Sequence, residues 1–169
     1  FRHWPPGTPV RFLLPRRWTA KRGTVVFDPP RDPGVLLTAA LFHHSDVPLI
    51  GGLLKGWMPA FPLHLWRLRR EVRVVYACSE PTLLSTLWFA VFSRLLGKRF
   101  VCFTWENIPY REKYGTLSFV LHRLVIDLNL RLSDGLVSGN REGEAICWHL
   151  AEELGPKASK KAPKAEEKS

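Results

Sequence analysis

Apolar runs alternate with amphipathic stretches through the second half of the chain. Val72–Ala77 and Arg99–Thr104 are β-rich runs that predict strands, and between them apolar residues recur at helical spacing up to about Leu96. Pro81 suits the first turn of this helix, and Gly97 suits its end. Strand, helix and strand in this order predict one βαβ unit whose two strands run parallel.

The same pattern repeats once more towards the C-terminus. A long amphipathic helix precedes the short strand Gly135–Ser138, and a further helix begins at Arg141, with Asn140 placed to cap it. The large apolar residues mark one face of each long helix. They are Leu83, Leu84, Leu87, Trp88, Val91, Phe92, Leu95 and Leu96 in the first, and Leu117, Val120, Leu121, Leu124, Val125, Leu128 and Leu132 in the second.

The first third of the chain is less regular. Val10–Leu14 and Leu36–Phe42 predict strands, residues 16–22 a basic loop, and Leu63–Arg70 the last turns of a helix. Prolines and glycines break residues 43–62 into a loop with short helical turns. Together these elements predict an α/β fold, a Rossmann-like three-layer domain with a mainly parallel sheet.

Length and composition indicate one domain with a tail. A chain of 169 residues, 46% of them hydrophobic, can bury one core. We expect residues 1–155 to form the domain and the Lys/Ala/Glu-rich residues 156–169 to be disordered, because they carry no large apolar side chain. The longest apolar segment, Pro81–Gly97, is interrupted by polar residues and is shorter than the roughly 20 residues that span a bilayer.

Positive charge is concentrated at the N-terminal end. The net charge is +10, and the residues up to Arg73 contain twelve Lys and Arg against four Asp and Glu, a surplus of eight. Cations and a tryptophan near the predicted first helix suit an anionic membrane surface, although a solvated helix end has the same composition. These residues are Lys55, Trp57, Arg67, Arg69 and Arg70. No nucleic-acid-binding module is recognisable, so we expect no nucleic acid partner.

Cysteine and histidine usage predicts neither a disulfide framework nor a metal site. Cys78, Cys102 and Cys147 are an odd number without a CxxC spacing, and His43-His44 lacks a third ligand at metal spacing. A reducing cytosol is the simplest setting. Glu144 and Glu152 have a spacing that some nucleotide-sugar enzymes use, but carboxylates two turns apart are also common on solvated helices.

Polar side chains follow all three predicted strands of the second half. Because the carboxyl ends of parallel strands meet at one edge, these side chains would form a ligand-binding edge, although each would also suit a helix cap or a turn. They are Ser79 and Glu80 after the first strand, Thr104, Glu106 and Asn107 after the second, and Ser138, Asn140 and Glu142 after the third.

The three loops and their strands resemble a known family. The segments VVYACSEP (74–81), LLGKRFVCFTWENIPY (95–110) and SDGLVSGNREGEAI (133–146) look like the N-terminal, acceptor-side domain of family 4 glycosyltransferases of the GT-B fold. The resemblance covers roughly residues 72–150. The family commonly has a histidine where this chain has Ser79, and no first strand with its glycine-rich loop precedes Val10.

The resemblance implies a function for the polar loops. Family members are retaining enzymes that move a sugar from a nucleotide-diphosphate donor to an acceptor held between two Rossmann-like domains. It implies that the polar residues after the three strands contact the acceptor, a lipid-linked sugar or a saccharide. The donor-binding domain lies outside this sequence, so we expect the chain to bind no cofactor, to be inactive alone and to need a donor-domain partner.

A second hypothesis comes from the charge. A non-catalytic basic module would dock on an anionic membrane or on a protein partner through its N-terminal third. Both hypotheses place the chain in the cytoplasm. The basic surface favours a peripheral position at the inner face of the membrane.

Overall fold

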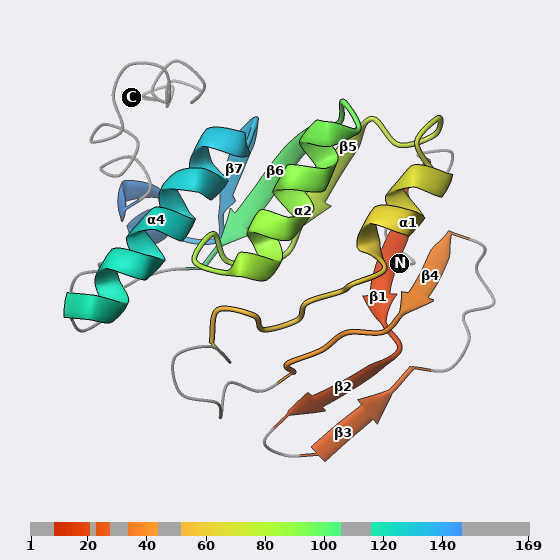
Figure 1. Ribbon diagram of the computed structural model, residues 1–169, viewed down its shortest axis with the longest axis horizontal. Helices are drawn as coiled ribbons and strands as arrows, with labels where there is room; N and C mark the ends of the chain where they lie inside the picture. The colour runs from red at the N-terminus through yellow and green to blue at the C-terminus, as the bar shows by residue number, and fades with distance from the viewer. Residues whose placement is uncertain (1–8, 21–22, 28–33, 44–51, 106–115, 147–169) are drawn as a thin grey trace, which may run out of the picture.

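Parallel strands and the helices that connect them form the main body of the protein (Figure 1). The computed structural model describes residues 9–20, 23–27, 34–43, 52–105 and 116–146. The chain is a mixed α/β protein whose sheets are mainly parallel. The tail 156–169 and the boundary at residue 155 lie outside the described residues.

A three-stranded parallel sheet is built by the second half of the chain. Its strands are β5 (Val74–Ala77), β6 (Arg99–Thr104) and β7 (Gly135–Ser138), in the order β5-β6-β7. The helix α2 (Leu84–Leu95) connects the first pair, and α4 (Thr116–Leu132) precedes β7. Both predicted βαβ units are therefore confirmed.

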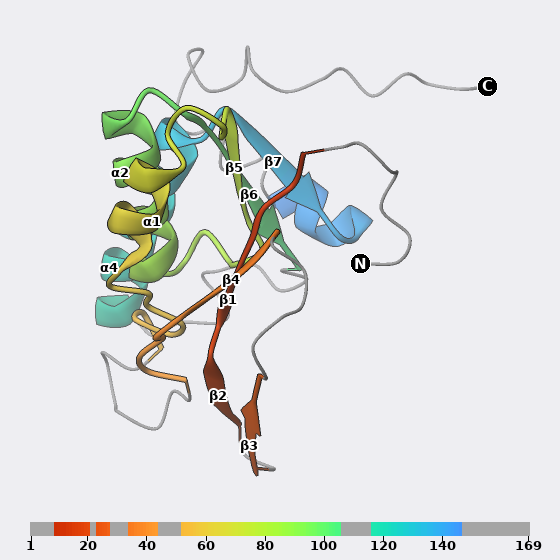
Figure 2. The same cartoon turned by 90° about the vertical axis from the view of Figure 1, so that its right-hand side faces the viewer.

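The helices are distributed unevenly over the two faces of this sheet. α2, α4 and α1 (Phe61–Arg67) lie on one face, whereas the helical residues 141–146 lie on the other side (Figure 2). Ala77, Phe100 and Cys102 point from the sheet into the core beneath α2, where they pack with Ala90. The opposite face carries Tyr76, whose side chain is exposed.

The N-terminal third forms two small sheets. β1 (Phe12–Pro15) pairs in parallel with β4 (Val35–Thr38). The strands predicted at Val10–Leu14 and Leu36–Phe42 are therefore present, but the second one ends at Thr38 instead of Phe42. The predicted basic loop at residues 16–22 is wrong at Arg17–Ala20, which form the strand β2 and pair antiparallel with β3 (Gly23–Val26), whereas residues 21 and 22 lie outside the described residues. Gly23 has a φ of 136°, which a side chain would disfavour, and it lets the chain turn back into β3.

The buried face of α2 differs from the predicted one. Its buried residues are small, Ser85, Thr86, Ala90 and Ser93, whereas the side chain of Leu95 is 71% exposed. Their hydroxyls are hydrogen-bonded: Ser93 donates to the Phe89 carbonyl one turn earlier at 2.6 Å, and Ser85 donates to the carbonyl of Lys55, before α1, at 2.7 Å. Small residues let α2 approach the sheet closely, so size rather than hydrophobicity selects this face.

The buried face of α4 also differs from the predicted one. Val125 and Ile126 are buried as expected of an apolar face, but His122 and Asn129 are buried with them. Four large apolar residues of the predicted inner face are exposed instead, namely Val120, Leu121, Leu124 and Leu128. Among the described helices, none is long and apolar enough to cross a membrane.

Candidate functional site

Glu80 joins the carboxyl ends of β5 and β6. Its Oε2 accepts a hydrogen bond from the Thr104 hydroxyl at 2.7 Å, and its Oε1 accepts one from the Trp105 backbone N–H at 2.8 Å. Thr104 is fully buried, so its hydroxyl needs this partner. Both carboxylate oxygens are engaged, which makes Glu80 a clamp between the loop after β5 and the end of β6.

Trp105 continues the connection to β7. The Asn140 side-chain amide donates to the Trp105 carbonyl at 3.3 Å, and the Gly139 N–H donates to the Thr104 carbonyl at 2.9 Å. A methyl group on Gly139 would approach the Trp105 ring to 2.4 Å, so the indole rests against the glycine backbone. The expected meeting of the three strand ends is confirmed by these contacts.

Asn140 has a second role as a helix cap. Its Oδ1 accepts the Gly143 N–H at 2.5 Å, which confirms the predicted cap, and the Ser138 hydroxyl donates to the Asn140 carbonyl at 2.6 Å. Glu142 is exposed in the first turn of this helix. Ser138 therefore stabilises a turn and Asn140 caps a helix, as the alternative interpretation of these residues predicted. The Asn140 side-chain NH2 group still donates to the Trp105 carbonyl.

The loop after β5 is fixed from beneath. Ser79 and Thr86 hydroxyls hydrogen-bond at 2.8 Å, and Thr86 donates to the Glu80 carbonyl at 2.7 Å. From α4, the buried Asn129 amide donates to the Pro81 carbonyl at 2.8 Å. Ser79 thus contacts α2 and stabilises the loop that presents the Glu80 carboxylate.

Two of the predicted site residues, Glu106 and Asn107, lie outside the described residues. The same holds for Glu152, whereas Glu144 is exposed on the helix that follows β7. Among the residues that the structure describes, no three His, Cys, Asp or Glu side chains are grouped as metal ligands.

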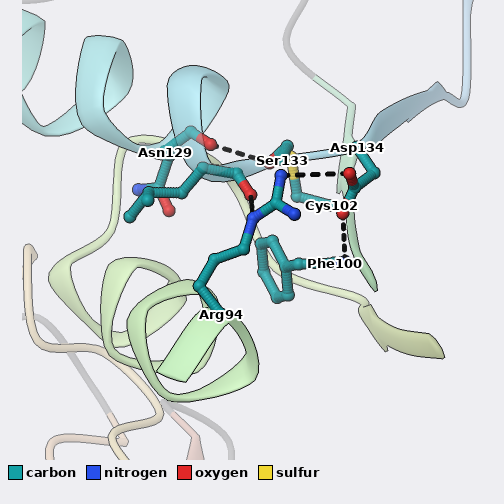
Figure 3. Close-up of polar contacts among 7 residues, drawn as sticks. Arg94, Phe100, Cys102, Asn129, Ser133 and Asp134 are labelled. Atoms are coloured by element: carbon teal, nitrogen blue, oxygen red, sulfur yellow. Dashed lines mark hydrogen bonds and ion pairs between the residues drawn. The ribbon is translucent and has the colours of Figure 1, made fainter. Parts of the chain in front are cut away.

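The amino end of the sheet has its own carboxylate clamp (Figure 3). Asp134 Oδ2 accepts the Phe100 backbone N–H at 2.9 Å, and Asp134 Oδ1 forms an ion pair with Arg94 at 3.0 Å. Arg94 Nε also donates to the Leu132 carbonyl at 2.7 Å. This clamp connects the starts of β6 and β7 to α2.

A cationic hollow lies next to this clamp. It has a volume of about 370 Å³ and is lined by Arg73, Lys98 and Arg99 together with Val74 and Gly97. The Lys98 ammonium donates a hydrogen bond to the Arg69 carbonyl. This bond connects the segment after α1 to the same end of the sheet. Arg73 and Arg99 are exposed at this hollow, and cations gathered at one place on a surface favour anion binding.

The structure separates the residues of the predicted membrane-surface patch. Arg67 ends α1, Arg70 is exposed just beyond it, and the Arg69 guanidinium lies 4.3 Å from the centre of the Trp66 ring. Trp57 is half-buried and packs against Trp88, with 5.3 Å between ring centroids. Lys55 is exposed in the turn that precedes α1. Arg69 is connected to the amino end of the sheet through its carbonyl and Lys98, and Trp57 packs on α2 through Trp88.

Burial shifts the titration of two groups in the central sheet. It raises the pKa of the Cys102 thiol above its ordinary value of 9.0, so this thiol stays protonated at neutral pH. Burial, and then the nearby Cys78, also raises the pKa of Tyr76. Neither group is poised as an acid or a base near pH 7.

Comparison with known proteins identifies no relative. No family model matches the chain, and neither the curated proteins nor the solved structures contain a match.

The sequence analysis did not predict which residues connect the strands at each end of the sheet. Trp105 was not singled out, because a tryptophan directly after a buried strand also suits the core. Gly139, between Ser138 and Asn140, is the one signal that a ring would pack there. The hollow combines Arg73 with Lys98 and Arg99, which the chain separates by a whole helix.

Proposed function

We propose that this chain is the acceptor-side domain of a glycosyltransferase. It has a Rossmann-like arrangement and works with a donor-binding domain that holds a nucleotide-diphosphate sugar. The observation that carries the proposal is the union of three strand ends by Glu80, Trp105 and Asn140. Open α/β sheets bind ligands at this edge.

The edge offers groups suited to an acceptor that carries hydroxyls. Carboxylate and carbonyl oxygens accept hydrogen bonds, and the Asn140 amide donates them. Because Glu80 already accepts bonds from Thr104 and Trp105, it acts as a positioning residue that holds the loops. The donor-binding partner supplies the nucleotide-diphosphate sugar, and this chain orients the acceptor hydroxyl towards it.

Sugar transfer is the direct test. The chain is completed with the flanking coding sequence, and transfer from labelled UDP-glucose, UDP-N-acetylglucosamine and GDP-mannose to membrane lipids and oligosaccharides is measured. The proposal expects transfer by the completed protein and none by this chain alone. Turnover by the chain alone would contradict the need for a partner, and no transfer by the completed protein would contradict the enzymatic role.

The cationic hollow favours a second function. A basic module would dock on anionic lipid through Arg73, Lys98 and Arg99, at the amino end of the sheet. β6 has six residues, which at about 3.3 Å each span roughly 20 Å. A bilayer bound at the hollow would therefore leave the acceptor edge facing away from the lipid, so docking and acceptor binding would use opposite ends.

A further inference from the structure

We propose that the indole of Trp105 is a stacking platform for a pyranose ring of an uncharged saccharide. This inference rests on the proposed function and narrows it, because it selects a saccharide among the acceptors of a sugar transferase. The platform is the exposed ring, and the hydrogen-bonding groups beside it are those of Glu80 and Asn140.

The ring is held in a fixed orientation. Its backbone is bound on both sides of the residue, since the N–H of Trp105 donates to Glu80 and its carbonyl accepts from Asn140. The indole rests against Gly139, where three ring atoms lie 2.4–2.6 Å from the place that a Cβ would occupy. A platform of this kind loses little conformational freedom when a ligand stacks on it.

The ring is nevertheless open to solvent. The side chain of Trp105 is 61% exposed, although it is one of the largest apolar groups of the chain. It packs edge-to-face with Phe103 at 5.3 Å, and Phe103 in turn meets Tyr76 at 6.5 Å. Side chains alternate along a strand, so this row lies on the face of the sheet opposite Ala77, Phe100 and Cys102. Its two ends, Tyr76 and Trp105, are exposed, and an aromatic surface beside polar loops suits a ligand with both apolar and polar surfaces.

The local chemistry favours a neutral sugar over an anion. An aromatic face carries partial negative charge, which attracts the weakly positive C–H groups on the flat side of a pyranose. The Glu80 carboxylate repels phosphates, because both of its described hydrogen-bond donors are neutral and neither is a cation. Anionic ligands would instead be drawn to the hollow at the other end of the sheet.

Calorimetric titration of the full chain with cellotetraose and maltotetraose tests the platform. Both probes are uncharged and differ in how flat a C–H face they present. We expect saturable binding, and we expect Trp105→Ala to raise the Kd about tenfold or more, because the variant loses the stacking contact. Trp66→Ala is the matched control, since Trp66 is 53% exposed on α1 at a distance from the acceptor edge, and it should leave binding unchanged.

Gly139→Ala probes the same platform without removing the ring. The new methyl group would force the indole to move, whereas the φ of Gly139 is not in the left-handed region that requires glycine. We expect this variant to stay folded by circular dichroism and to bind several-fold more weakly. If Trp105→Ala does not fold, Gly139→Ala and Trp105→Phe decide the question.

The outcomes separate the platform from the proposed function. Binding that weakens in the Trp105 and Gly139 variants, but not in Trp66→Ala, supports the platform. No binding of either probe, or binding that ignores Trp105, overturns it. Transfer by the completed protein to an acceptor that is not a saccharide overturns the platform and leaves the glycosyltransferase function standing.

Discussion

The two ends of the central sheet are each held by one carboxylate, but in opposite electrostatic surroundings. At the amino end Asp134 binds the Phe100 amide and the Arg94 guanidinium, beside a hollow lined by cations. At the carboxyl end Glu80 binds a hydroxyl and an amide, both neutral donors. Similar carboxylate clamps thus stand beside a basic surface at one end, made by Arg73, Lys98 and Arg99, and beside the exposed indole of Trp105 at the other.

This difference assigns different ligands to the two ends. The amino end suits anions because its cations surround a concave surface. The carboxyl end suits a ligand rich in hydroxyls, because the Asn140 amide and the exposed indole lie beside a carboxylate whose described donors are neutral. In our proposal, acceptor binding and attachment to anionic surfaces are separated by the length of the strands.

The largest expected effect is on lipid binding at the amino end. Replacing Arg73, Lys98 and Arg99 together by alanine should weaken binding to vesicles of phosphatidylcholine with phosphatidylserine roughly 100-fold, at about 1 kcal/mol for each cation. Co-sedimentation measures this.

Arg17, Arg131 and Arg141 form a matched control for that triple variant. They carry the same total charge, are exposed and lie outside the hollow. If their alanine variant loses as much binding, the net charge rather than the hollow attracts the vesicles.

The next largest effect is on stability at the amino end. Asp134→Ala should lower the free energy of unfolding by about 2–3 kcal/mol, because it removes the partner of Arg94 and of the Phe100 amide. Asp127→Ala, which removes only the i,i+4 ion pair with Arg123, should cost about 0.5 kcal/mol. Urea denaturation compares them, and equal losses would show that the clamp contributes nothing special.

A smaller loss is expected from the carboxyl-end clamp. Glu80→Ala leaves the buried Thr104 hydroxyl without its carboxylate partner, whereas the exposed segment at Trp105 can bind water, so we expect about 1–2 kcal/mol. Glu80→Gln keeps one acceptor oxygen and should cost less. A larger loss for Glu80→Ala than for Asp134→Ala in the same denaturation series would reverse the ranking of the two ends.

The smallest effect concerns the middle of the sheet, at Cys102. Burial raises the pKa of this thiol, so the folded state favours the protonated form. That contribution is complete below the ordinary value of 9.0 and is lost as the pH rises through the raised pKa. Stability should therefore fall less steeply above pH 9 in Cys102→Ala than in the parent chain. Parallel slopes would show that other groups cause the fall.

Site-resolved alkylation checks the same burial independently. Iodoacetamide should modify the exposed Cys78 in the folded protein, and it should modify the buried Cys102 only when the protein is unfolded. Equal modification of both cysteines without denaturant would contradict the burial of Cys102.

The strands of the central sheet were predictable, whereas the helix faces were not. Arg99–Thr104 and Gly135–Ser138 are short β-rich runs between turn residues, and the structure has strands with these bounds. On α2, both sides carry residues that a buried face accepts, and close packing selects the small ones such as Ala90. Hydrophobicity along the sequence does not record how closely a helix approaches its sheet.

The meeting of the strand ends at the carboxyl edge of the sheet was predictable in its place but not in its contacts. Parallel strands end together, so Glu80 and Thr104 were expected to meet, and they hydrogen-bond. The hydrogen bonds that Glu80 and Asn140 make within the protein depend on side-chain geometry. The spacing of residues along the sequence does not determine that geometry. The position of the Trp105 ring depends on Gly139, since only a residue without a side chain leaves room for the ring there.

Amide chemical-shift mapping of the isotope-labelled chain during titration with cellotetraose tests the central claim most directly. The account predicts saturable shifts at Trp105, Gly139 and Asn140, and none at the cationic hollow of Arg73, Lys98 and Arg99. Shifts at the hollow instead, or no shifts at the carboxyl end at saturating sugar, would contradict it.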